Sequence, residues 1–440
     1  MRFTDLLFAF AIVYLPYEAH YPLVLDVKGV NALNMIIVVL LVVILVRRER
    51  APTPTPLKGR FLFFFAALTI AFLIGESYDS WTFADDLTVL KDMVMYASLY
   101  FIYYHGARDE RSVRVLYAAV MLTLFLISLQ GVRQAFDYGI ASYNPNRRIT
   151  GPFGGGAVFG ANMAAGYFII MLPMAMATLV MARSRPLLRL ASAVCIGLGT
   201  FATFYTYSRQ AYFALAALFL LIGVRRSAFF AIVLLVLGAT FDQWAPDTVM
   251  QRIDQTEQVS SGGEEQLDAS TESRFLLWQG GMELFSERPW GIGLNHWKRS
   301  IGPHVPAAYK GFDAHNGFVL LTTECGVLGI ASFVFLIAGL WGLARRMEKL
   351  PDADSQLYGY AFGMAVLGLV CANLFGSRIS NGEVMVDFWA LAGIAARHYT
   401  MALARSREPA KAQAEAPGAP APASMVEVDL HHAAGGSRRQ

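Results

Sequence analysis

Cysteine is scarce in this chain of 440 residues, and the three cysteines, Cys195, Cys325 and Cys371, all lie inside apolar stretches. They form no paired C-x-x-C motif, so we expect neither a disulfide framework nor a zinc site, and we interpret them as small core residues. Charge is scarce as well, since Asp, Glu, Lys and Arg make up only 16% of the residues and the net charge is +3. The total charge therefore says little about partners.

The sequence also lacks a phosphate-binding loop of the nucleotide-binding type. The stretch "GPFGGGAVFG" that begins at Gly151 is rich in glycine but has no lysine, and it leads into an apolar run. The D-x-D motif of Asp352 and Asp354 would suit metal-assisted sugar-nucleotide chemistry. It falls, however, on the opposite side of the membrane from the candidate site described below, so we interpret it as a helix cap.

Apolar residues are abundant, at 55% of the chain, which is typical of a polytopic membrane protein. We predict an all-α fold with about twelve transmembrane helices, because a helix needs about 20 mostly apolar residues to cross the bilayer. The first run, after Arg2, could instead be a signal peptide, but no small-residue cleavage site follows it. The twelve segments are Phe3–Tyr14, Ala32–Val46, Phe61–Ile74, Leu87–Tyr104, Val113–Gln130, Gly160–Met181, Leu187–Phe204, Ala211–Gly223, Ala228–Phe241, Gly317–Leu343, Leu357–Phe375 and Val384–Ala404.

Lys and Arg gather in alternate loops, and short cytoplasmic loops collect such residues. This pattern places both termini in the cytoplasm. It divides the chain into nine spans (1–241), an external loop (242–314), three more spans (315–405) and an Ala- and Pro-rich tail (406–440) that we expect to be disordered. The cytoplasmic basic residues are Arg47, Arg48, Arg50, Arg108, Arg111, Arg114, Arg183, Arg185, Arg189, Arg225, Arg226, Arg345, Arg346, Lys349, Arg405 and Arg407.

The external loop contains one amphipathic segment, "TESRFLLWQGGMELFSERP". Its residues Phe275, Trp278, Met282 and Phe285 recur at steps of three and four, the spacing of one helix face. We expect a helix that starts near Ser270 or Thr271, stops before Pro289, and lies along the membrane surface or over a cavity of the bundle.

Five arginines stand out on the side predicted to be external, where positive charge is disfavoured. Each one alone is also explained as an interfacial arginine that reaches lipid phosphates. Because the guanidinium group is planar, stays charged and binds phosphate oxygens in pairs, the set predicts a site for a phosphate or pyrophosphate group. The five are Arg147, Arg148, Arg209, Arg274 and Arg378, of which Arg209 is expected at the first turn of the eighth span.

His315 lies on the same side, directly before the tenth span. Its position alone fits a capping residue, but a histidine that is neutral near pH 7 can also act as a general base. Asp313 or Asn316 is close enough to orient its ring. Glu324, nine residues on, is about 13.5 Å away along a helix, so we expect it to bond to a neighbouring span instead.

These residues give the sequence a resemblance to the O-antigen ligase and polymerase superfamily of bacterial cell-envelope glycosyltransferases, and most of all to the O-antigen ligases. Those enzymes carry a histidine followed by Asn, Ser or Gln, then nine residues, a glycine, two residues, and a small or aromatic residue. His315, Asn316, Gly326 and Gly329 match that spacing. The stretches "YSRQAYFALAALF" and "SRFLLWQGGMELFSERPWGIGLN" are similar too, and the resemblance covers about residues 140 to 345.

The resemblance implies an inverting glycan transfer at the periplasmic face of the inner membrane, without metal, nucleotide or other cofactor. The donor would be an undecaprenyl pyrophosphate-linked glycan and the acceptor a sugar hydroxyl of the lipid A core. Under this hypothesis His315 is the general base, and Arg209 and Arg274, helped by Arg147 or Arg148, hold the pyrophosphate. Further candidate substrate contacts are Asn316, Trp278 and Arg378.

Two kinds of alternative remain open from the sequence. An O-antigen polymerase and a protein O-oligosaccharyltransferase would use the same donor and differ in the acceptor. A lipid-linked glycan flippase or transporter would also need many spans and arginines. Charge along both halves of its path would favour a flippase, whereas internal repetition would favour a transporter.

Overall fold

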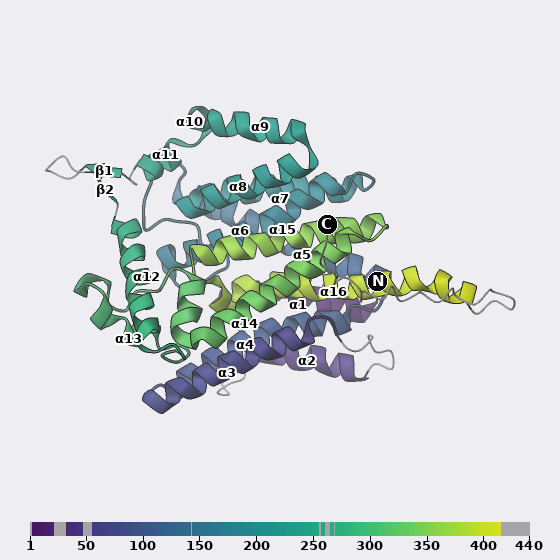
Figure 1. Ribbon diagram of the computed structural model, residues 1–440. Coiled ribbons are helices and arrows are strands. Elements are labelled where there is room, and N and C mark those ends of the chain that lie inside the picture. Colours follow the sequence, from purple (N-terminus) through teal and green to yellow (C-terminus); the bar gives the residue numbers. More distant parts are fainter. Residues whose placement is uncertain are drawn as a thin grey trace, which may run out of the picture.

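The computed structural model describes residues 2–21, 32–46, 55–141, 143–254, 257–259, 265–267 and 269–414. Its long helices run side by side in one bundle, with the end of α16 at one extremity and α12 (Ala269–Glu287) across the other (Figure 1). Each predicted span coincides with a helix: α1 (Phe3–Tyr14), α2 (Ala32–Val46), α3 (Lys58–Tyr78), α4 (Phe83–Gly106), α5 (Glu110–Tyr138), α6 (Gly156–Met181), α7 (Pro186–Tyr205), α8 (Arg209–Arg226), α9 (Ala228–Ala239), α14 (Gly317–Glu348), α15 (Ala353–Leu374) and α16 (Gly382–Ala414).

Among the described residues, six of these helices are long and apolar enough to cross a membrane, namely α3, α5, α6, α7, α14 and α15. Three others, α1, α2 and α9, are apolar but have only 12 to 15 residues. The remaining three, α4, α8 and α16, have 18 residues or more but lack a stretch of that length that is both apolar and poor in charge. The chain is therefore a multi-pass membrane protein, in which six of the predicted twelve spans meet a strict length and hydropathy criterion.

The centre of the bundle is formed by α6 and α15. Of the most apolar 18 residues of each helix, 89% are buried in α6 and 78% in α15, against 28% in α7, whose outer face is left for lipid. Small residues permit the close approach, since a side chain on Gly368 of α15 would collide with the backbone of Ile169 in α6.

The segment between α9 and α14, which the sequence predicts to be external and which we call the external segment, is folded on the bundle end and is not purely helical. After α10 (Phe241–Trp244) and α11 (Asp247–Asp254), two three-residue strands, β1 (Glu257–Val259) and β2 (Glu265–Leu267), form an antiparallel pair. This small hairpin departs from the all-α prediction. Then follow α12, α13 (Trp297–Ser300) and two 3₁₀ turns, η2 (Gly302–His304) and η3 (Ala307–Tyr309).

The predicted amphipathic helix is present as α12, and its two faces differ in exposure. Leu277 and Leu284 belong to a small core with Trp297, while Phe275 and Met282 are 56% and 47% exposed. The packed face contains glycines because the backbone of α12 comes close to its neighbours: a side chain on Gly281 would lie 2.8 Å from the Trp297 ring. Of the predicted apolar stripe, Phe275 and Met282 are therefore exposed, whereas Trp278 and Phe285 are half-buried.

A break in α14 fixes the path of the external segment. Gly326 has φ 62° and ψ −159°, a conformation that is essentially restricted to glycine. The opened turn receives the chain after α12, where the Val327 amide donates to the Pro289 carbonyl at 3.0 Å and the Ile292 amide donates to the Thr323 carbonyl at 3.0 Å. The interruption of the helix thus ties the external segment to the bundle.

At the other end of the bundle the helix termini are tied together by charge. Asp352 caps α15 by accepting from the Ser355 amide at 2.8 Å, and Asp354 pairs with Arg185. The interpretation of the D-x-D motif as a helix cap is confirmed for Asp352. Helix α16 continues to Ala414, so it includes the first part of the predicted tail. Arg47, Arg48, Arg50 and residues 415–440 lie outside the described residues.

Candidate active site

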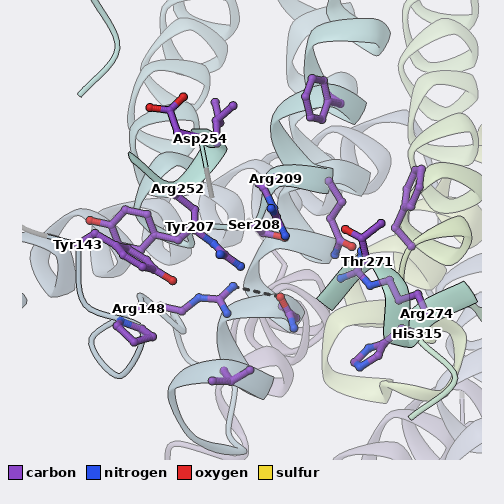
Figure 2. Close-up of a pocket in the computed structure, with 17 residues that line it drawn as sticks. Tyr143, Arg148, Tyr207, Ser208, Arg209, Arg252, Asp254, Thr271, Arg274 and His315 are labelled. Atoms are coloured by element: carbon purple, nitrogen blue, oxygen red, sulfur yellow. Dashed lines mark hydrogen bonds between the residues drawn. The ribbon is translucent and has the colours of Figure 1, made fainter. Parts of the chain in front are cut away.

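A cavity of about 850 Å³ lies under α12, where segments far apart in the sequence meet. It gathers positive side chains from a loop before α6, from the start of α8, from α11 and from α12, together with the histidine before α14. Figure 2 shows the guanidinium groups of the first three directed into one space, with that of α12 beside the histidine. These residues are Arg148, Arg209, Arg252, Arg274 and His315.

Arg148 is buried, and two hydrogen bonds fix its guanidinium group. Its Nε donates to the Thr206 carbonyl at 2.7 Å, and its Nη2 donates to Asn162 Oδ1 at 3.1 Å. Burial lowers the pKa of Arg148 to about 10, to which Arg252 and Arg274 also contribute, so the group remains a cation at neutral pH. A fixed guanidinium at the wall of a cavity is suited to an anionic ligand.

Arg209 is placed by a tight turn between α7 and α8. Helix α7 ends at Tyr205 and α8 begins at Arg209, so the prediction that Arg209 occupies the first turn of its span is confirmed. Tyr207 in this turn has φ 50°, which costs energy for a residue other than glycine. The Ile149 amide donates to the Tyr205 carbonyl at 3.1 Å, which joins the loop of Arg148 to the same turn.

Arg252 was missed by the sequence analysis. It lies on the short helix α11, and its guanidinium carbon is 5.6 Å from the centre of the Tyr143 ring. The loop was predicted to be external, so a complete count of its positive residues would have found Arg252. Nothing in the sequence distinguishes it, however, from the other cations of that loop, which do not line this cavity, such as Lys298 and Arg299.

His315 stands at the edge of the cavity with 27% of its side chain exposed. Its amide donates to Asp313 Oδ2 at 3.1 Å, and its Nδ1 lies 3.5 Å from the same oxygen, which also accepts from the Ser377 hydroxyl at 3.2 Å. His315 has φ 50°, a left-handed conformation that is uncommon for histidine. Asp313 is therefore the residue that orients the ring, one of the two that the sequence suggested.

Burial lowers the pKa of His315 below its usual value. Asp313 opposes this effect, whereas Arg274, Arg378 and Lys298 add to it. The imidazole is therefore neutral at pH 7, the form in which it can accept a proton.

The other predicted site residues do not line this cavity. Arg147 is exposed, whereas Arg148 is buried. Asn316 caps α14, because its Oδ1 accepts from the Phe318 and Val319 amides at 2.9 and 3.2 Å. Trp278 donates from Nε1 to the Ala314 carbonyl at 2.9 Å, so it supports the segment that carries the histidine.

Arg378 borders a second cavity, of about 220 Å³, which also has Asp313 in its wall. It is buried, and it donates from Nη1 to Asn381 Oδ1 at 3.0 Å. Burial lowers its pKa to about 10, so it too is charged at neutral pH. Its effect on the pKa of His315 is therefore electrostatic.

Glu324 does not bond to a neighbouring span as expected. It is buried inside α14, and its Oε1 accepts from the Trp297 amide in the external segment at 3.0 Å. Its role is to anchor that segment, since a buried carboxyl group must find a donor and the opened turn at Gly326 brings one near.

One flank of the large cavity is apolar and outward-facing. Val158, Phe213 and Phe375 line it and are 55%, 69% and 38% exposed. In a bundle of membrane helices such a surface faces lipid. The cavity therefore suits a molecule with an anionic head and a hydrocarbon tail.

No curated protein matches this chain. The motif of His315, Gly326 and Gly329 lies within residues 191–334, as do Arg209, Arg252 and Arg274, whereas Arg148 and Arg378 lie outside this range. Residues 191–334 match the family model described as O-antigen ligase, whose members are glycan-transferring enzymes.

Proposed function

We propose that the protein is an O-antigen ligase of the bacterial inner membrane with its active site facing the periplasm. It would transfer a glycan from undecaprenyl pyrophosphate to a sugar hydroxyl of the lipid A core. The observation that carries the proposal is the meeting of His315 with Arg148, Arg209, Arg252 and Arg274 around one cavity that has an apolar, outward-facing flank. A polyprenyl pyrophosphate has the matching parts, a dianionic or more highly charged head and a hydrocarbon tail.

In the proposed reaction the acceptor hydroxyl oxygen attacks the anomeric carbon of the donor glycan. His315 takes the hydroxyl proton, for which Nε2 is available when Nδ1 carries its hydrogen toward Asp313. The bond between the anomeric carbon and the pyrophosphate oxygen breaks, and undecaprenyl pyrophosphate leaves with the electron pair. Attack opposite to the leaving group inverts the anomeric configuration.

The arginines would serve the leaving group. Negative charge grows on the pyrophosphate as the bond breaks, and fixed cations that are already in place stabilise it without reorganisation. Arg148 fits this role because its hydrogen bonds to Thr206 and Asn162 hold it in position. The reaction needs no added metal ion, since the guanidinium groups supply the positive charge.

The alternative functions differ from the proposed one either in the acceptor or in being transport instead of catalysis. A polymerase or a protein O-oligosaccharyltransferase would use the same cavity and donor. A flippase is disfavoured, because the four arginines of the cavity belong to one end of the bundle, near α12, and a carrier path would need charge along both halves (Figure 1).

The test is transfer by the purified full-length protein. It would be given a glycan linked to undecaprenyl pyrophosphate together with lipid A core or a serine-containing peptide. We expect transfer to the core, and a loss of about 10²- to 10⁴-fold in His315→Gln, which removes the base but keeps a polar side chain. His304→Gln, on the same external segment but outside the cavity, should retain the wild-type rate. Transfer to the peptide alone would show that the acceptor is a protein and not the lipid A core. Transfer to neither acceptor would contradict the proposal.

A further inference from the structure

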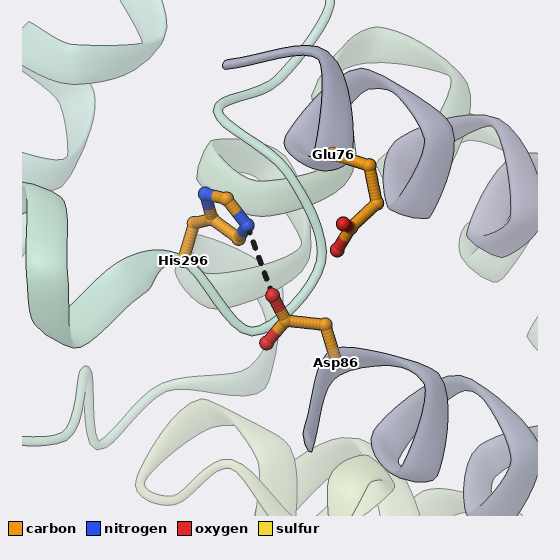
Figure 3. A group of neighbouring side chains, drawn as sticks. All are labelled: Glu76, Asp86 and His296. Carbon is orange, nitrogen blue, oxygen red and sulfur yellow. Dashed lines mark ion pairs between the residues drawn. The ribbon is translucent and has the colours of Figure 1, made fainter. Parts of the chain in front are cut away.

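Three side chains that could bind a metal ion meet away from the cavity, where α3, α4 and the external segment touch. Glu76 is near the end of α3, Asp86 is in the first turn of α4, and His296 directly precedes α13. One ligand atom from each lies within 4.8 Å of the others (Figure 3). None of the three lines the cavity of His315.

Two of these residues have buried polar atoms without a hydrogen bond to any described residue. Both carboxylate oxygens of Glu76 are in this situation, and so is Nε2 of His296. His296 is only 4% exposed, and its Nε2 points at Asp86 Oδ2 from 3.2 Å without the alignment of a hydrogen bond. Buried carboxylate and imidazole groups are normally satisfied, so the arrangement requires a partner.

Asp86 is arranged as a ligating carboxylate would be. Its Oδ1 accepts from Asn295 and Arg299, each at 2.7 Å. Its Oδ2, which faces His296, accepts from Arg299 at 2.7 Å and from the Thr82 hydroxyl at 2.9 Å. Hydrogen bonds of this kind orient ligands in metal sites. Arg299 also lies 3.6 Å from Asp79, so its charge is shared between two carboxylates while Glu76 receives no hydrogen bond.

The chemistry of the three groups narrows the choice of ion. An imidazole nitrogen disfavours Ca²⁺ and Mg²⁺, which take oxygen ligands, and the absence of a thiolate disfavours Cu⁺. Zn²⁺ takes nitrogen and carboxylate oxygen at about 2.0 to 2.2 Å and four ligands in all. A shift of a fraction of an ångström would bring the three atoms to that distance. Two carboxylates also balance the double positive charge.

We propose that Glu76, Asp86 and His296 bind a structural Zn²⁺ ion that fastens the external segment to the α3–α4 pair. The segment is already pressed against α3 at this point: the Leu294 amide donates to the Ala71 carbonyl at 3.3 Å, and a side chain on Gly75 would lie 2.8 Å from His296 Nε2. The ion would hold the stretch of chain next to Trp297, whose amide donates to Glu324. It takes no part in glycan transfer, so the proposal stands independently of the reaction.

The experiment is metal analysis of the full-length protein, purified in detergent through a tag that does not bind metal. Mass spectrometry of the elements should find about one zinc per chain in the wild type. Glu76→Gln and His296→Ala should lose most of it. His304→Ala is the matched control. His304 is on the same segment, and its ring nitrogens lie 3.6 Å from Glu283 Oε2 and 3.8 Å from Glu287 Oε2, but both of these carboxylates are exposed. A double His431→Ala, His432→Ala variant controls for the tail and should keep the zinc.

Thermal unfolding gives a second readout. After chelation, added Zn²⁺ should raise the Tm of the wild type and of His304→Ala by several degrees and leave Glu76→Gln unchanged, because binding to the folded state alone stabilises it. Zinc well below one per chain, with no Zn²⁺-dependent shift in the wild type, would overturn the proposal. In that case Glu76 is a protonated carboxylic acid bonded to Asp86, and Glu76→Gln would melt at or above the wild-type temperature.

Discussion

Arg147 and Arg148 are neighbours in the sequence with opposite surroundings. Arg148 is buried in the cavity wall and fixed by Thr206 and Asn162, whereas Arg147 is exposed outside the cavity. A sequence pattern cannot separate them, because the choice depends on which way the loop turns after Pro145. The pair therefore supplies a matched control for any test of the arginines.

Arg209→Lys keeps the positive charge but loses the planar pair of donors. Losing a charge-assisted hydrogen bond costs about 1.5 to 3 kcal/mol, so we expect kcat/KM to fall about 10- to 100-fold. Steady-state transfer with the purified protein would measure this. Arg147→Lys should be close to wild type. Equal rates in Arg209→Lys and wild type would mean that Arg209 contacts lipid and not the donor.

The pH dependence of transfer should report His315. The rate should fall as the pH drops through the pKa of His315, which burial holds below its usual value, because the base is then protonated. Asp313 raises that pKa, so Asp313→Asn should move the acid limb of kcat/KM to still lower pH while lowering the plateau, since the ring loses its orienting partner. An acid limb that stays in place or moves to higher pH would contradict the role of Asp313.

At the scale of the element, the break in helix α14 explains why the motif that begins at His315 contains a glycine at position 326. Gly326 is the point where the helix opens to receive the backbone of Pro289 and Trp290, and a side chain there would collide with both. The motif thus reports a crossing of two chain segments in the helix that follows His315. It is a requirement of packing and does not place Gly326 in the chemistry.

Gly326→Ala should therefore destabilise the protein, by strain on the order of 1 to 3 kcal/mol in addition to the collision. We expect a lower Tm in detergent and a lower yield of folded protein. Gly342→Ala is the control in the same helix, because a side chain there has nothing within 4 Å and alanine favours helix. A Tm of Gly326→Ala equal to that of Gly342→Ala would show that the break is not required.

The positions of the helices follow from the sequence better than their contacts do. Apolar runs located the twelve bundle helices because lipid and core both demand apolar residues over a helix length. The face of α12 that packs against the protein was not predicted, since the closest approach is made by Gly280 and Gly281 and not by its aromatic residues. The cavity could not be predicted either, because it joins α8, α11, α12 and the loops before α6 and α14, and only the tertiary fold brings these together.

At the scale of the whole molecule, the proposed orientation places α12 in the periplasm and the end of α16 in the cytoplasm. These elements lie at opposite ends of the bundle (Figure 1). A cysteine at exposed Glu287 should react with a membrane-impermeant maleimide in cells with a permeabilised outer membrane, and a cysteine at exposed Ser406 only after lysis. The native Cys195 and Cys325 are buried and should react slowly. The reverse pattern would invert the topology and exclude transfer in the periplasm.

The crowding of arginines around the cavity has a kinetic consequence. The glycan leaves the site attached to its acceptor, but undecaprenyl pyrophosphate keeps every negative charge of the donor and its whole hydrocarbon tail. Arg148, fixed to Thr206 and Asn162, cannot turn away from it. Under the proposed reaction the spent carrier competes with fresh donor for the same guanidinium groups, so turnover depends on how quickly the surrounding membrane removes it.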